Sequence, residues 1–195
     1  MTHYKKIDQY HAETTDQLSE HYREILKLAG EDIKREGILK TPERAAKSIQ
    51  FLTHGSHINP ADILKSALFK EDYKQMVLVK DIEMYSLCEH HMLPFFGKAH
   101  IAYIPNGKIV GLSKIPRVVD AFSRRLQVQE RLTMQIANEL KTILGTESVA
   151  VVIDAVHLCV SSRGVQDTNS STVTAHYSGK FKQEDTKNEF LGLIR

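Results

Sequence analysis

The spacing of the apolar residues changes near residue 75 of this 195-residue chain, and that change limits the folds available to it. Before this point apolar residues recur three and four positions apart, the period of an amphipathic helix. After it, short runs rich in Val, Ile and Tyr are typical of strands. A chain that begins with helices and continues with strands and further helices is predicted to be α+β, with helices packed on an antiparallel sheet.

The helical first part is predicted to contain three segments. The segment 14–37 places apolar residues at helical spacing and ends at a glycine. The segments 41–55 and 59–69 each begin with a capping residue, Thr41 or Asn59, followed by a proline that suits the first helical turn. These segments predict an N-terminal helical arm.

The second part is predicted to contain the sheet. Strands are expected at 76–87, 148–160 and 170–181, with a hairpin that turns at Asn106-Gly107. The helices expected there span residues 113–126, 129–145 and 185–195. We therefore expect two domains, a helical arm over residues 1–70 and a sheet domain over residues 71–195.

Composition is that of an ordinary soluble globular protein, with 42% apolar residues, 26% charged residues and a net charge of +2. This charge gives no reason to expect a nucleic-acid or membrane partner. The polar stretch 1–17 lacks the apolar core of a signal peptide, and no run approaches the ~18 apolar residues of a membrane span. We therefore expect a cytoplasmic protein.

The two cysteines each have a histidine nearby in the sequence. Cys88 and His91 have a C-x-x-H spacing, which lets a tight turn bring a thiolate and an imidazole to one metal ion. His157 and Cys159 are two positions apart in a predicted strand, so we expect both side chains on one face. A reducing cytosol argues against a stable disulfide between the cysteines. The pattern predicts a zinc site.

Two arrangements of that site fit the spacing. If all four side chains bind the metal, the site is closed and the chain is a nonenzymatic structural zinc module. If three bind it, the fourth position is open for water, which is the catalytic arrangement. His90 would then be available for proton transfer.

Side chains that suit a phosphorylated substrate recur along the chain, some of them at a predicted helix start. They are Ser113, Lys114 and Arg117 in GLSKIPR, Arg163 in SSRG, and Arg44 and Lys47 in TPERAAK. In QVQERL, Gln129 and Glu130 open another predicted helix. A carboxylate there suits the paired N–H groups of guanine, although an exposed acid at a helix start is also common.

Taken together, TPERAAK, SLCEHHMLPFFGKAHIAYIP, GLSKIPR, QVQERLT, DAVHLCVSSRG and SSTVTAHYSGKF resemble the zinc-dependent GTP cyclohydrolase I family over roughly residues 20 to 195. The resemblance implies the tunnelling fold, a four-stranded antiparallel sheet with two helices on one face, preceded by a helical arm. It also implies a homodecamer with active sites between subunits.

The resemblance assigns roles residue by residue. It implies that Cys88, His91 and Cys159 bind zinc and leave one position open, and that His90 and His157 transfer protons. It places guanine recognition on Glu130 with Gln129 beside it, and triphosphate contacts on Ser113, Lys114, Arg117, Arg163, Arg44 and Lys47.

The implied reaction converts GTP and water to 7,8-dihydroneopterin triphosphate and formate, the first step of tetrahydrofolate and pterin biosynthesis. It proceeds through hydroxide attack on C8, ring opening and recyclisation. A related pterin or deazaguanine enzyme of the same fold would be distinguished by a nucleophilic cysteine or a three-histidine metal site, and the sequence shows neither pattern.

Overall fold

The computed structural model describes residues 10–195, which divide into two compact units between Thr53 and His54. Of the stretch 1–17, expected to lack a signal peptide, the first nine residues lie outside the described part. Within the described residues, no helix combines the length and the apolar character needed to cross a membrane. The domain boundary expected after residue 70 stays a prediction.

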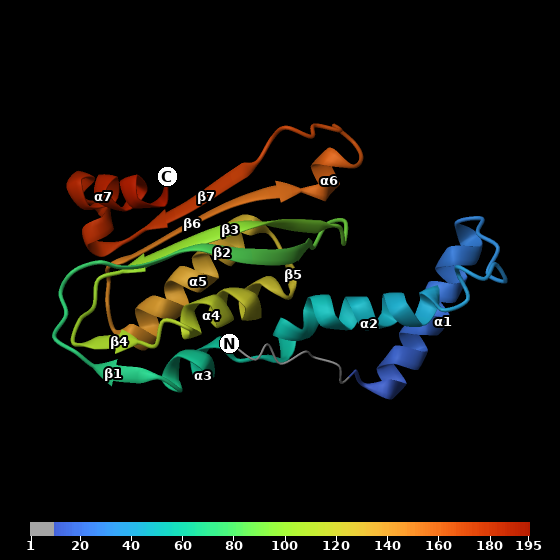
Figure 1. The fold of residues 1–195 in the computed structure, drawn as a ribbon, viewed down its shortest axis with the longest axis horizontal. Helices are drawn as coiled ribbons and strands as arrows, with labels where there is room; N and C mark the ends of the chain where they lie inside the picture. Colours follow the sequence, from blue (N-terminus) through green and yellow to red (C-terminus); the bar gives the residue numbers. More distant parts are fainter. Residues whose placement is uncertain (1–9) are drawn as a thin grey trace. The chain divides into compact units, whose positions relative to one another are not determined.

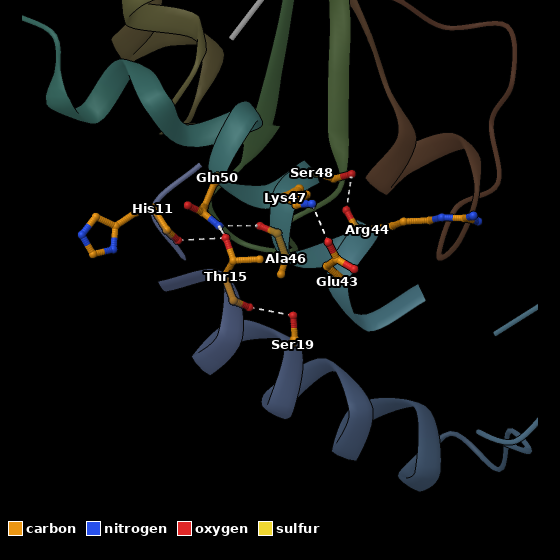
Figure 2. Close-up of polar contacts among 9 residues, drawn as sticks. All are labelled: His11, Thr15, Ser19, Glu43, Arg44, Ala46, Lys47, Ser48 and Gln50. Atoms are coloured by element: carbon orange, nitrogen blue, oxygen red, sulfur yellow. Dashed lines mark hydrogen bonds and ion pairs between the residues drawn. The ribbon is translucent and has the colours of Figure 1, made fainter. Parts of the chain in front are cut away.

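The first unit is a pair of helices, α1 (Ala12–Leu28) and α2 (Thr41–Thr53). The helix predicted over 14–37 is therefore too long, because Gly30 takes a left-handed φ of 85° directly after α1 and stops the helix there. Figure 2 shows how the two helices are joined. The Gln50 amide on α2 donates to the Thr15 hydroxyl on α1 over 2.9 Å.

The second unit is built on a five-stranded sheet of order β5-β2-β3-β6-β7. The long strands β2 (Val77–Cys88), β3 (Pro94–Tyr103), β6 (Val149–His157) and β7 (Thr172–Tyr177) are antiparallel. The short β5 (Leu126–Gln127) pairs in parallel with the end of β2. The expected four-stranded antiparallel sheet is confirmed, with this one short strand added at its edge.

Two helices, α4 (Lys114–Ser123) and α5 (Gln129–Leu144), cover one face of the sheet (Figure 1). Alternate residues of β3, among them Phe95, Ile101 and Tyr103, point to these helices and are fully buried. Burying one such side chain contributes roughly 1.5–3 kcal/mol. This alternation explains why the strand periodicity predicted the sheet, because it determines which side chains of each strand face the helices.

The remaining elements are short. They are η1 (His54–His57), α3 (Pro60–Lys65), β1 (Leu68–Lys70), β4 (Lys108–Val110), α6 (Leu158–Ser161), η2 (Gly179–Lys182) and α7 (Glu184–Ile194). Phe190 of α7 is fully buried and packs with Ala102 and Ala150 of β3 and β6 in a second cluster of buried residues. The hairpin predicted at Asn106-Gly107 is wrong, because β4 pairs with β1 and not with β3.

Candidate metal centre and its surroundings

Three potential metal ligands come together where β2 and β6 end. The ligand atoms of Cys88, His91 and Cys159 all lie within 4.8 Å of one another. The Cys88 Sγ is 3.8 Å from Nδ1 of His91. Cys88 is buried, Cys159 is half-buried and His91 is exposed, so the group opens toward solvent on its histidine side.

The loop between β2 and β3 forms the tight turn that the C-x-x-H spacing predicts. The Cys88 N–H donates to the carbonyl of Leu93 over 2.8 Å, and the Cys88 carbonyl accepts from the N–H groups of Met92 and His91. Met92 takes a left-handed φ of 53° to close the loop. The backbone therefore folds back within six residues and brings the His91 ring to the Cys88 thiol.

Cys159 reaches the group from a different element than expected. The prediction that His157 and Cys159 share one strand face is wrong, because β6 ends at His157 and residues 158–161 form α6. The Ser161 hydroxyl donates back to the His157 carbonyl over 3.3 Å. This helical turn carries the Cys159 thiol into the ligand group, whereas His157 stays outside it.

The donor set suits a zinc ion. Two sulfurs and one imidazole nitrogen are the soft and borderline ligands that zinc prefers, and three protein ligands are the number found at catalytic sites. Burial, followed by the neighbouring Cys88 thiol, raises the pKa of Cys159, while the positive charge of Arg163 acts in the opposite direction. A bound divalent cation would favour the thiolate forms of both cysteines.

His157 lies beside this group in a well-defined environment. Its ring stacks on Phe95 with the centroids 4.6 Å apart and the planes 3° from parallel. Its Nε2 is 2.7 Å from Oε1 of Gln129. Burial lowers the pKa of His157, and the negative charge of nearby Glu130 partly opposes that shift. The neutral imidazole is therefore favoured.

His90 is mostly exposed, next to His91 in the same loop, with the two ring centroids 6.2 Å apart. Its Nε2 is 4.0 Å from a Glu89 carboxylate oxygen. Glu89 also accepts two hydrogen bonds from the Arg131 guanidinium, which lowers the pKa of the Glu89 carboxyl. This paired contact ties the loop that carries His90 and His91 to the first turn of α5.

The first turn of α5 also contains the two residues predicted to recognise guanine. Their side chains differ in environment, because Gln129 is 2% exposed whereas Glu130 faces solvent. The negative charge of the exposed Glu130 acts on the His157 imidazole, and its role in recognising guanine stays a prediction. The buried Gln129 side chain bonds to groups of the protein itself.

The residues predicted to contact phosphate do not all converge on the metal group. Ser113, Lys114 and Arg117 occupy the start of α4, where Ser113 is at the N-cap position but its hydroxyl makes no capping bond. The other end of α4 leads into β5, which pairs with Cys88. A helix of 10 residues is about 15 Å long, and this length separates the start of α4 from the end that leads into β5.

The other three cationic residues are divided between the units. Arg163 follows α6 and lies close enough to Cys159 for its charge to affect that thiol. Arg44 and Lys47 belong to α2 in the first unit, where Lys47 pairs with Glu43 (Figure 2). The phosphate-binding role of these residues stays a prediction.

Sequence reasoning missed the side chains that support the predicted ones. Phe95 was read only as part of an apolar run, and the pairing of Glu89 with Arg131 was not anticipated. Their positions in the sequence could have indicated that Glu89 and Arg131 lie near the site. Glu89 is inside the C-x-x-H loop, and Arg131 follows Glu130 directly.

Comparison with known proteins points to one family. The family model described as GTP cyclohydrolase I matches residues 18–195. Relatives named GTP cyclohydrolase 1 include that of Parabacteroides distasonis, 60% identical over 91% of this chain and 91% of the relative. The relative from Bacteroides fragilis is 57% identical over 92% and 93% of the two chains. The relative from Chlorobaculum tepidum is 60% identical over 87% and 76%.

A solved structure of an archaeosine synthase QueF-Like in the apo form is also similar. It shares 17% sequence identity and a TM-score of 0.45, over 53% of this chain and 93% of the other.

Proposed function

The chain belongs to the GTP cyclohydrolase I family, and we propose that Cys88, His91 and Cys159 form its catalytic metal centre. Its reaction is the conversion of GTP and water to 7,8-dihydroneopterin triphosphate and formate, the first step of tetrahydrofolate and pterin biosynthesis. The observation that supports the proposed centre is the convergence of two thiols and one imidazole within 4.8 Å.

The metal proposed for this centre is zinc. When bound by three protein ligands, zinc lowers the pKa of water in its open position toward ~7, which makes a nucleophile available at neutral pH. The two cysteines and His91 would hold it, because their donor atoms already lie near one another at the surface of the unit.

His157 and His90 are proposed to move the protons of the reaction. Hydrolysis at C8 of the purine requires a proton at N7 and the removal of protons from the attacking water. His157 is held beside the metal group by Phe95 and Gln129, and burial favours its neutral form. His90 is exposed next to the ligand His91, where it can exchange protons with solvent.

Glu130 is proposed to recognise guanine. Its carboxylate is exposed at the first turn of α5 and can accept hydrogen bonds from N1–H and the exocyclic amine of the base. The negative charge of Glu130 acts on His157, so the two side chains are near each other. A guanine held by Glu130 would therefore place its five-membered ring near His157. This arrangement orients the reacting carbon toward the metal centre.

Ser113, Lys114 and Arg117 are proposed to bind the triphosphate of a substrate held mainly by a neighbouring subunit. These residues lie at the start of α4, whereas the other end of α4 leads into β5, which pairs with Cys88, and membership of the family supports an oligomeric assembly. This supports a homo-oligomer, and we propose a homodecamer with active sites between subunits. Arg163, and Arg44 and Lys47 from the arm, are proposed as further phosphate contacts.

A closed structural zinc module is the alternative function. It needs a fourth protein ligand, for which His157 is the candidate. The donor atoms that lie within 4.8 Å of one another belong to Cys88, His91 and Cys159, and His157 is not among them, which favours the open catalytic site. Both cysteines are free thiols, as expected for a reducing compartment, and we propose a cytoplasmic location.

The proposed function is tested by incubating the purified protein with GTP and measuring formate and pterin fluorescence. We expect both products from GTP and neither from ATP. We further expect a chelator to abolish the reaction and added zinc to restore it. Product formation that persists after complete metal removal would contradict the metal centre, and absence of formate from the zinc-loaded protein would contradict the activity.

A further inference from the structure

The orientation of the Gln129 amide is dictated by its neighbours. Its Nε2 lies 2.8 Å from the carbonyl oxygen of Thr172 and 3.1 Å from that of Ile153. A backbone carbonyl can only accept a hydrogen bond, so the NH₂ group must face these two oxygens. The residue is 2% exposed, so water does not compete for these contacts. The amide oxygen must therefore point the other way, toward His157.

The amide oxygen in turn determines which nitrogen of His157 carries a hydrogen. Oε1 of Gln129 lies 2.7 Å from Nε2 of His157 and can only accept. Nε2 must then be the donor, and in the neutral imidazole the lone pair is on Nδ1. The plane of the ring is fixed separately, because it stacks on Phe95, the residue paired with His157 across β3 and β6.

We propose that Gln129 is a positioning residue that holds His157 as the Nε2–H tautomer and leaves Nδ1 as the nitrogen that exchanges protons with the substrate. This inference rests on the proposed function, in which His157 transfers protons. The resemblance placed Gln129 beside Glu130 among the substrate-binding residues, and that part of the prediction is untested.

The anchoring of Gln129 explains how this tautomer is maintained. The side chain joins three elements, since it starts on α5 and bonds to β6 and β7. Its Nε2 is also 3.1 Å from the Thr174 hydroxyl, which in turn is 2.7 Å from the Thr133 hydroxyl. Turning the amide over would set its oxygen against two carbonyl oxygens, which can only accept, and its NH₂ group against the N–H of His157. A polar group left unsatisfied in this way costs about 1–3 kcal/mol.

The same helical turn links base recognition to proton transfer. Glu130 follows Gln129 directly, so one backbone segment places both the proposed guanine acceptor and the residue that orients His157. Rearrangement of this turn would change both functions together.

Neutron diffraction on the deuterium-exchanged, zinc-loaded protein tests the tautomer without any variant. We expect deuterium on Nε2 of His157 and on the Gln129 nitrogen that faces the two carbonyls. Deuterium on Nδ1 with none on Nε2 would overturn the inference. This result is independent of turnover, so it is distinct from a failure of the proposed function, which would appear as absence of formate release by the unmodified protein.

A double-mutant cycle tests the positioning role in catalysis. We expect Gln129→Met, which removes the acceptor at similar volume, to lower kcat about 10- to 100-fold while KM for GTP changes less than about threefold. In a His157→Ala background the same substitution should cause no further loss. A raised KM with kcat kept, or an equal further loss without His157, would overturn the proposal.

Gln135→Met is the matched control for that cycle. Gln135 is on the same helix, and its Oε1 accepts a hydrogen bond from Gln127 over 2.8 Å, with no contact to His157. We expect this variant to keep the kcat of the unmodified protein. A loss of kcat equal to that of Gln129→Met would mean that any lost glutamine contact on α5 disturbs the site, and would overturn the specific role.

Discussion

At the scale of single residues, the proposed chemistry assigns metal binding and proton transfer to different side chains that lie close together. Cys88, His91 and Cys159 hold the metal, whereas His157 lies beside them with its Nε2 directed to Gln129. Metal binding and proton transfer should therefore be separable by substitution. Burial of one thiol and exposure of His91 also leave one side of the centre accessible to substrate.

Replacing either thiol by a hydroxyl should remove the metal. We expect Cys88→Ser and Cys159→Ser to lose zinc, measured by mass spectrometry of the purified protein, together with formate release, because a serine hydroxyl does not ionise to a comparable ligand. Ser161→Ala, which alters α6 without touching a ligand, should keep its zinc. Full zinc occupancy in both cysteine variants would refute the ligand assignment.

Removing the His157 ring should leave the metal in place. We expect His157→Ala to retain zinc and to lose about 10²- to 10⁴-fold in the rate of formate release, the usual contribution of a positioned acid or base. The measurement pairs zinc content with initial rates at saturating GTP. A variant that loses its metal would show that His157 is a ligand instead.

Removing the charge of Glu130 should weaken recognition of the base. We expect Glu130→Gln to raise KM for GTP about 10- to 100-fold, because a charge-assisted hydrogen bond is exchanged for a mismatched amide. Selectivity for GTP over ATP should fall with it. Unchanged selectivity in competition assays would argue against the guanine contact.

At the scale of helices and strands, one glycine determines how closely β3 and β6 approach. A Cβ on Gly97 would lie 2.0 Å from the carbonyl oxygen of Asp154 and 2.6 Å from the Cα of Ala155. These are backbone atoms of the neighbouring strand, so only a shift of β6 could make room. The same pair of strands contains the stacked Phe95 and His157, which makes this spacing relevant to the site.

Adding that methyl group should destabilise the fold. We expect Gly97→Ala to lower the free energy of unfolding by about 1–3 kcal/mol, measured by denaturant titration. Gly192→Ala is the control, since a Cβ there meets nothing within 4 Å, and it should stabilise α7 by about 0.5–1 kcal/mol. Equal effects of the two substitutions would contradict the steric account.

Helices and strands with regularly spaced apolar residues were predictable from the sequence. Elements that depend on pairing with a distant segment of the chain were not. The long strands and the amphipathic α4 and α5 match their patterns, and Asn59 and Gly145 cap helices as expected. The hairpin predicted at Asn106-Gly107 was wrong because β4 pairs with β1, which is distant from it in the sequence. A local pattern does not specify which strand a segment pairs with.

At the candidate site, contacts within one loop were predictable from the sequence, whereas contacts between distant elements were not. The C-x-x-H spacing predicted a turn that joins Cys88 and His91, since both residues belong to one loop. The contribution of Cys159 was anticipated, but through a strand, whereas α6 supplies it. The contact between Gln129 and His157 joins α5 to β6 and depends on tertiary packing, so no local signal gives it.

At the scale of the whole molecule, we propose that each active site combines residues of more than one chain. The start of α4 carries the proposed triphosphate contacts, whereas the other end of that helix leads into β5, which pairs with Cys88, and we propose that the two sets combine across a subunit boundary. In solution we expect a particle ten times the 22.2 kDa chain mass.

Mixing two inactive variants should restore activity if sites are shared. We expect Cys88→Ser and Lys114→Ala subunits, co-expressed in equal amounts, to form mixed oligomers with about a quarter of their sites intact. Formate release by the mixture, with each variant alone as control, measures this recovery. No recovery in verified mixed oligomers would place both residues in one subunit's site and contradict shared sites.

The central claim is that two thiols and one imidazole hold zinc and leave one position open for chemistry. X-ray absorption at the zinc edge of the loaded protein reports the number and type of ligand atoms. We predict two sulfur and one nitrogen ligands from the protein, with one light ligand from solvent. Two sulfurs with two histidine nitrogens, or a metal without sulfur ligands, would contradict the claim.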